Sequence, residues 1–182
     1  MISDYVKGKT KFDYPPSIQH GIMLHRMIDT FTDSHEANRE AKEVFRPYYR
    51  LYSGAFVDVV YDHFLATDTQ EFSEESLLAF SLGVYDDLDK QLDWQPAKFA
   101  HMYPYMKEHN WLYSYRTHHG THKSLSGVVR RAAYLTESEM AVEQFEKQYQ
   151  LLKDCYRHFW ASVKAYTRQQ FDDIQNQRIT FH

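Results

Sequence analysis

Histidine and aspartate side chains recur at helical spacing in residues 21–33. His25 and Asp29 are four residues apart, and Asp29 and Asp33 repeat that step. Residues four apart lie on the same side of a helix, so the imidazole and the carboxylates could bind one cation together. Two plainer interpretations stay open. His25 and Asp29 could form a hydrogen-bonded surface pair, and Asp33 could be a helix N-cap in a capping box with Glu36.

A second group lies in residues 54–66, the most apolar part of the chain. Asp58 and Asp62 are one helical turn apart, and His63 follows Asp62 directly. Two carboxylates at this spacing repel each other unless a cation or a proton lies between them. Adjacent helical residues diverge by about 100°, so one member of the Asp62 and His63 pair would orient the other. The two groups together predict a shared metal site for Mn²⁺, Mg²⁺ or Fe²⁺.

Other chemistries find little support. The sequence contains neither a glycine-rich phosphate loop nor a GxSxG motif. Residues 118–122 hold three histidines without acidic companions in what reads as a polar turn, and we interpret them as solvated surface. Cys155 lies on an apolar stripe and is interpreted as core rather than nucleophile. Solvated surface is also expected for His20, His35, His101, His109 and His158. Hydrolysis by a metal-activated water fits the residue types best.

The composition predicts one all-α domain over residues 1–182. Hydrophobic residues make up 43% of the 182 positions, enough for a substantial core, whereas only 6 glycines and 5 prolines are available for turns. The single cysteine allows no intramolecular disulfide, which favours a cytoplasmic protein. No apolar run approaches the roughly 18 residues of a membrane span, and no signal peptide is recognisable. A net charge of −4 gives no sign of nucleic-acid binding.

The helices that position these residues can be placed from their caps and periodicity. Ser17 is the expected N-cap of the first full helix, and Ser73 caps a helix over residues 74–92. Pro96 opens a helix that Pro104 should end or kink. The other expected helices cover residues 34–51, 55–66, 121–133 and 137–175.

The last expected helix carries a stripe of apolar residues at alternating steps of three and four. Such a stripe is typical of a helix that spans the core of a bundle. Dimerisation through its exposed end is the alternative. The stripe consists of Val142, Phe145, Tyr149, Leu152, Tyr156, Phe159, Val163 and Tyr166.

The combined motifs resemble the acyl carrier protein phosphodiesterase family, all-helical proteins related to the HD-type metal phosphohydrolases. The resemblance covers nearly the whole chain and is best at Asp58 with Asp62-His63-Phe64-Leu65. It also rests on Asp4-Tyr5-Val6-Lys7-Gly8, Tyr14-Pro15-Pro16, Gly21-Ile22, His25-Arg26, Ile28-Asp29 and Thr32-Asp33, and less strongly on Trp111-Leu112, Tyr115-Arg116, Gly127 and His158-Phe159-Trp160.

The resemblance implies hydrolysis of the phosphodiester that joins 4′-phosphopantetheine to a serine of holo-acyl carrier protein, with Mn²⁺ as the favoured ion. Family members start about twenty residues earlier, so Asp4 lies near the start of this chain, where fraying is expected. The resemblance therefore implies either a start assigned at an internal methionine or the loss of the first helix, and in both cases the given sequence lacks a histidine that would complete the metal site.

For this reaction we expect a metal site made of His25, Asp29, Asp62 and His63, joined by Asp4 and Asp58. Asp33 and His63 are the candidate acids for the serine leaving group. Arg26 could hold the phosphate, although a surface salt bridge is its plainer role.

Carrier proteins of this family are acidic, so a local basic patch is expected, made of Lys7, Lys9 and Lys11 or of Lys123, Arg130 and Arg131. Two alternatives stay open. One is an HD-like phosphohydrolase acting on a small nucleotide or phosphoester, and the other is a carrier-protein-binding protein without catalysis.

Overall fold

The computed structural model describes residues 2–176, and all regular elements in that range are helical. The predicted all-α fold with a long C-terminal helix is confirmed, while the HD-like arrangement stays a prediction. The α-helices are α1 (Pro16–Ser34), α2 (Glu36–Tyr49), α3 (Ser53–Ala66), α4 (Glu74–Asp89), α5 (Ala97–Glu108), α6 (Trp111–Ser114), α7 (His118–Arg131), α8 (Glu139–Lys147) and α9 (Tyr149–Gln175). The 3₁₀ helices are η1 (Ser3–Tyr5), η2 (Gly8–Asp13), η3 (Arg50–Tyr52) and η4 (Leu92–Trp94).

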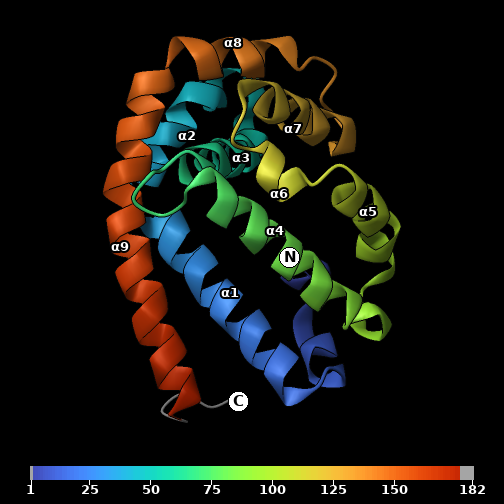
Figure 1. Ribbon diagram of the computed structural model, residues 1–182. Coiled ribbons are helices and arrows are strands. Elements are labelled where there is room, and N and C mark those ends of the chain that lie inside the picture. The colour runs from blue at the N-terminus through green and yellow to red at the C-terminus, as the bar shows by residue number, and fades with distance from the viewer. Residues whose placement is uncertain (1, 177–182) are drawn as a thin grey trace.

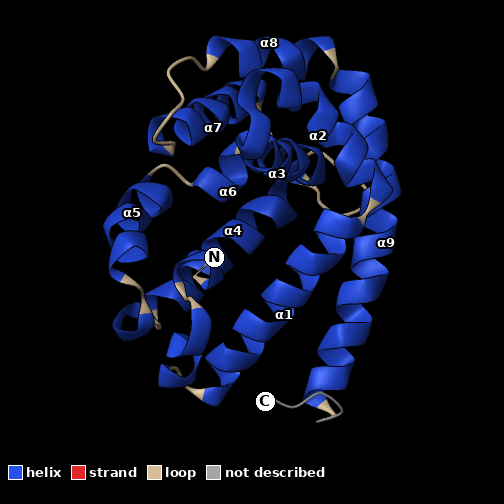
Figure 2. Ribbon diagram, turned by 180° about the vertical axis from the view of Figure 1, so that it is seen from behind, coloured by secondary structure: helices blue, strands red, loops and turns tan. Residues whose placement is uncertain are grey.

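Helix α3 lies inside the bundle and contacts α2, α7 and α9. The long helix α9 runs beside α1 and also packs on α2, as both views of the molecule show (Figures 1 and 2). Helix α8 crosses the end of the bundle next to α7 (Figure 1). This packing brings the acidic residues of α1 and α3 to the same side of the molecule.

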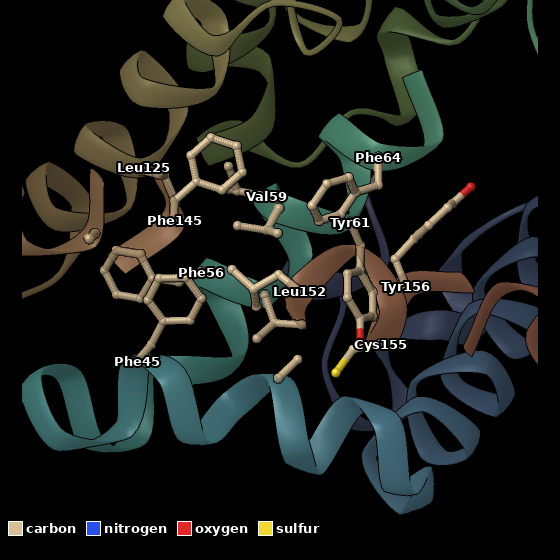
Figure 3. Close-up of a cluster of buried hydrophobic side chains, with 14 of the residues drawn as sticks. Phe45, Phe56, Val59, Tyr61, Phe64, Leu125, Phe145, Leu152, Cys155 and Tyr156 are labelled. Carbon is tan, nitrogen blue, oxygen red and sulfur yellow. The ribbon is translucent and has the colours of Figure 1, made fainter. Parts of the chain in front are cut away.

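A large aromatic cluster forms the main core (Figure 3). Phe45 of α2 stacks on Phe56 of α3, with 5.5 Å between the ring centroids. Phe145 of α8 and Leu152 of α9 are both fully buried beside them. Cys155 belongs to the same cluster, which confirms its interpretation as a core residue.

A second cluster anchors the N-terminal segment. Tyr85 of α4 packs with Phe99 and Tyr103 of α5, and Tyr5 of η1 lies edge-on to Phe99 at 6.1 Å between centroids. These contacts fix η1, and with it Asp4, beside α1.

Several predicted helix ends are wrong. Helix α1 begins at Pro16, whose missing N–H costs nothing at the first helical position, so Ser17 is not its cap. Asp33 lies inside α1, and His35 caps α2 by accepting from the N–H of Ala37, so the predicted capping box is absent from this junction. Ser73 caps α4, as predicted, and Ser76 completes a capping box that was not predicted; the helix ends at Asp89 rather than at residue 92.

The predicted helix over residues 137–175 is two helices. Gln148, at φ −106° and ψ 19°, separates α8 from α9. Helix α7 begins at His118, before the predicted residue 121. Within residues 2–176, none of the helices is both long and apolar enough to cross a membrane.

Candidate functional site

A cleft of about 1090 Å³ opens between α1, α3 and α9. Its acidic side is formed by Asp29 of α1 and by Asp58 and Asp62 of α3, with Asp4 of η1 and His25 of α1 beside them. Its opposite wall is the aromatic and apolar face of α9, which includes Tyr156, Phe159, Trp160, Val163 and Phe171. The fold therefore gathers five of the predicted metal ligands around one cavity.

Three of these side chains are close enough to share an ion. Nδ1 of His25 lies 2.9 Å from Oδ2 of Asp29, and Nε2 of His25 lies 3.9 Å from Oδ1 of Asp4. One ligand atom from each of the three lies within 4.8 Å of the other two. The spacing of four thus gives the predicted pair, and the N-terminal segment adds a second carboxylate.

Asp58 and Asp62 face the cleft from a helix whose other faces are buried. Both side chains keep exposed surface in the cavity, although protein atoms crowd them on most sides. Partial desolvation raises the pKa of Asp58 to about 6, against a lowering effect of Lys42, and the charges of Asp29, Asp33 and Asp4 raise it further.

The pKa of Asp62 is raised to about 7, first by desolvation and then by the charge of Asp58. The Tyr115 hydroxyl donates a hydrogen bond to the Asp62 carboxylate, which lowers that pKa in part. Burial and the Asp62 charge raise the pKa of Tyr115 in turn. The two carboxylates therefore sit under electrostatic strain, which a bound divalent cation would relieve.

His63 points away from the cleft into the core. Its Nδ1 lies 2.7 Å from the carbonyl oxygen of Tyr115 and 3.1 Å from the hydroxyl of Thr121, and its Nε2 lies 3.0 Å from the hydroxyl of Tyr149. Burial lowers the pKa of His63. The structure thus separates His63 from Asp62, the divergence expected of adjacent helical positions.

Asp33 and Arg26 border other cavities. Asp33 pairs with Lys42 at 2.8 Å, and both line a cavity of about 670 Å³ that Asp58 also lines. Nη2 of Arg26 donates to the carbonyl oxygen of Val6 at 2.8 Å, so this side chain ties the N-terminal segment to α1. The short distance to Val6 gives Arg26 a positioning contact that sequence reasoning had missed.

Residues 118–122 are helical, and the prediction of a polar turn without acidic companions is wrong. His118 and His122 both contact Glu146 of α8, at 2.7 Å in each case. Glu146 follows these histidines by 28 and 24 residues, so no local spacing in the sequence could have revealed the group.

His35 also departs from its predicted place on the solvated surface. It lies against Phe31 and Phe159, and burial lowers its pKa. Its role is to cap α2.

Basic side chains near the cleft were also missed. Arg46 and Arg50 line the same cavity as Lys42, next to Asp58. The predicted residues Lys123, Arg130 and Arg131 line a separate cavity of about 500 Å³, which also includes Tyr115. The helical periodicity of α2, which packs against α3, could have indicated the group made of Lys42, Arg46 and Arg50.

Comparison with known protein families matches residues 1–163 to a family described as "Acyl carrier protein phosphodiesterase". Curated relatives named "Acyl carrier protein phosphodiesterase" come from Salmonella dublin, Salmonella agona (strain SL483) and Salmonella newport (strain SL254). Each is 29% identical over 166 residues, which cover 91% of this chain and 86% of the relative. No solved structure matches the chain significantly.

Proposed function

The chain belongs to the acyl carrier protein phosphodiesterase family, a family of phosphodiester hydrolases, and we propose that it acts on holo-acyl carrier protein. The reaction would hydrolyse the phosphodiester between 4′-phosphopantetheine and the carrier serine, giving apo-carrier protein and free 4′-phosphopantetheine. The observation that carries the proposal is the gathering of Asp4, His25, Asp29, Asp58 and Asp62 around one cleft.

The donor set of the cleft fits a hard divalent ion. Four carboxylates and one imidazole suit Mn²⁺, Mg²⁺ or Fe²⁺, and we propose Mn²⁺ as the working ion. The residues that would hold it are His25, Asp29 and Asp62, with Asp4 and Asp58. When bound, such an ion lowers the pKa of a water ligand and offsets charge on phosphate oxygens. Because His63 points into the core, its proposed role in holding the ion is limited to orienting Asp62, its neighbour in the sequence.

The chain's own residues would position and neutralise the substrate. The Tyr115 hydroxyl holds the Asp62 carboxylate by a hydrogen bond. The aromatic and apolar wall of α9 gives the pantetheine arm a surface to lie on. Lys42 lies beside Asp58 and could offset the charge of an incoming phosphate.

The serine oxygen needs a proton when it leaves. Asp33 and His63 remain the proposed acids. Asp33 is the better placed of the two, because it shares a cavity with Asp58, whereas His63 is enclosed by the core. Arg26 remains a proposed phosphate ligand.

An acidic carrier must find a positive surface on an enzyme whose net charge is −4. Three basic groups qualify. The first is Lys7, Lys9 and Lys11, the second is Lys123, Arg130 and Arg131, and the third is Lys42, Arg46 and Arg50. We favour the third because it borders Asp58. Apparent affinity for the carrier should fall steeply with added salt, and a charge-reversed Arg46→Glu should weaken it more than Arg130→Glu.

Two further expectations belong to the proposal. The single, buried Cys155 suits a reducing compartment, and we propose that the protein works in the cytoplasm. A homodimer would use the far end of α9, where Phe171 is 45% exposed. Size-exclusion chromatography with light scattering would test the dimer.

The test is the intact mass of holo-acyl carrier protein after incubation with the chain and Mn²⁺. The carrier should lose the mass of phosphopantetheine with the natural chain and keep it with Asp62→Asn, while both proteins show the same helical circular dichroism. The matched control is Asp93→Asn, which changes an exposed aspartate of η4. Carrier binding without mass loss would favour the non-catalytic alternative. Hydrolysis of small phosphoesters alone would favour the HD-like alternative.

A further inference from the structure

Two imidazole side chains contact the same carboxylate at a place outside the acidic cleft. Nδ1 of His118 and Nε2 of His122 each lie 2.7 Å from the same atom, Oε1 of Glu146. A ligand atom from each of these three residues lies within 4.8 Å of the other two. None of the three lines the cleft, so this group is separate from the proposed catalytic site.

The fold holds the three side chains in place. His118 and His122 are one turn apart at the start of α7, and Glu146 lies in the last turn of α8. Helix α7 starts so close to α6 that a Cβ atom on Gly120 would lie 2.0 Å from the carbonyl oxygen of Ser114. The His118 ring also stacks on Tyr149, with centroids 5.3 Å apart and planes 14° apart. The His122 ring lies edge-on to Phe145 at 6.1 Å between centroids, so both imidazoles contact aromatic rings as well as Glu146.

Two imidazole nitrogens and one carboxylate oxygen form a ligand set that zinc uses when its fourth position stays open. Bonds of about 2.0–2.1 Å in a tetrahedron place ligand atoms about 3.3 Å apart. The two N···O separations of 2.7 Å need only a small widening, and the two imidazole nitrogens lie within 4.8 Å of each other. The side chains can supply it, because they are 50%, 34% and 43% exposed in His118, His122 and Glu146.

We propose that His118, His122 and Glu146 bind one transition-metal ion of the Zn²⁺ class and so clamp α7 to α8. Nitrogen-rich ligation favours Zn²⁺, Cu²⁺ or Ni²⁺ over Mn²⁺ and Mg²⁺, the opposite of the carboxylate-rich cleft. The plainer alternative is a clasp in which both imidazoles donate hydrogen bonds to Glu146 and no ion binds.

The full chain in an Asp29→Asn, Asp62→Asn background tests the proposal, since zinc binding in the cleft is then weakened. In this background His118→Gln with His122→Gln is compared with His119→Gln. A glutamine amide can still donate to Glu146, so the double substitution keeps the clasp but loses both nitrogen ligands. His119 is the matched control, because it lines the cavity of Lys123 instead.

Competition against a chromophoric chelator should give one tightly bound Zn²⁺ per chain, and Zn²⁺ should raise Tm. The double substitution should weaken binding by about tenfold or more and remove the Tm rise. His119→Gln should change neither result. The proposal is overturned if the parent chain binds no Zn²⁺, if the double variant binds it as tightly, or if His119→Gln loses as much. Bound Co²⁺ should show the visible absorption of a four-coordinate site only when both histidines are present.

Discussion

Replacing Asp62 with asparagine should stabilise the metal-free protein while destroying the proposed site. Asparagine has the shape of a protonated aspartate and carries no charge. The Asp62 carboxylate faces desolvation and the charge of Asp58, which together raise its pKa to about 7. Asp62→Asn removes that electrostatic strain and keeps a side chain that can still accept the hydrogen bond of Tyr115.

The pH dependence fixes the sign and size of the effect. In the unfolded chain an aspartate loses its proton near pH 3.8, whereas folded Asp62 keeps its proton up to about pH 7. Between these values the folded state binds more protons, so the free energy of unfolding falls as pH rises. The full difference would correspond to about 4 kcal/mol. Because Asp62 is exposed to solvent in the cleft, screening reduces the expected penalty to about 1–2 kcal/mol.

The assay is urea unfolding followed by circular dichroism, with a chelator present, at about pH 4 and about pH 8. Asp62→Asn should match the natural chain at the lower pH and exceed it by about 1–2 kcal/mol at the higher pH. Asp93→Asn should show no such gain. Added Mn²⁺ should stabilise the natural chain and leave Asp62→Asn nearly unchanged. A variant that is less stable at about pH 8, or that Mn²⁺ stabilises fully, would refute the reasoning.

Three further substitutions test the core and the site. Phe145→Ala empties the centre of the aromatic core and should lower the free energy of unfolding by about 3–5 kcal/mol in urea titrations; a loss below about 1 kcal/mol would show poor packing. Arg26→Ala frees the segment that carries Asp4 and should weaken Mn²⁺ binding about tenfold by calorimetry, whereas unchanged affinity would argue against Asp4 as a ligand. Tyr115→Phe removes the donor to Asp62 and should lower kcat about tenfold with little change in KM, and full turnover would remove Tyr115 from the site.

Local geometry was predictable from the sequence because helical periodicity fixes it. The four-residue spacing of His25 and Asp29 gives a contact of 2.9 Å, and Ser73 caps α4 as its neighbours indicate. The convergence of Asp58 and Asp62 with α1 was expected only from the residue types. It depends on how the two helices pack, which no local pattern encodes.

The missed features are long-range ones. Glu146 reaches His118 only because α8 folds back across α7. The apolar pattern of the sequence does not reveal the break at Gln148. Side chains of α8 and α9 pack in one continuous core, so the apolar stripe runs through Phe145 and Leu152 without interruption. The turn between the two helices changes direction without changing which residues are apolar.

Pro104 shows packing overriding a local rule. Proline removes a helical hydrogen bond, yet α5 continues to Glu108. Tyr103 and Met106, on either side of it, are buried in the second cluster, while Pro104 itself faces solvent. The carbonyl that loses its partner can therefore be hydrated, and the buried side chains hold the helix together.

The same reasoning explains why the strain in α3 persists. Phe56 and Phe64 are buried in the main core, and burying each such side chain is worth about 1.5–3 kcal/mol. Asp58 and Asp62 are one turn apart on α3, so only unwinding that helix could separate them, and this would expose Phe56 and Phe64 at a cost greater than the penalty of about 1–2 kcal/mol expected for the carboxylate. The core therefore holds the two charges together whether or not a cation is present. A bound divalent ion relieves the repulsion between the two carboxylates, and this relief contributes to the free energy of ion binding. Affinity for a divalent ion should therefore rise with pH through the range near 7 in which Asp62 ionises.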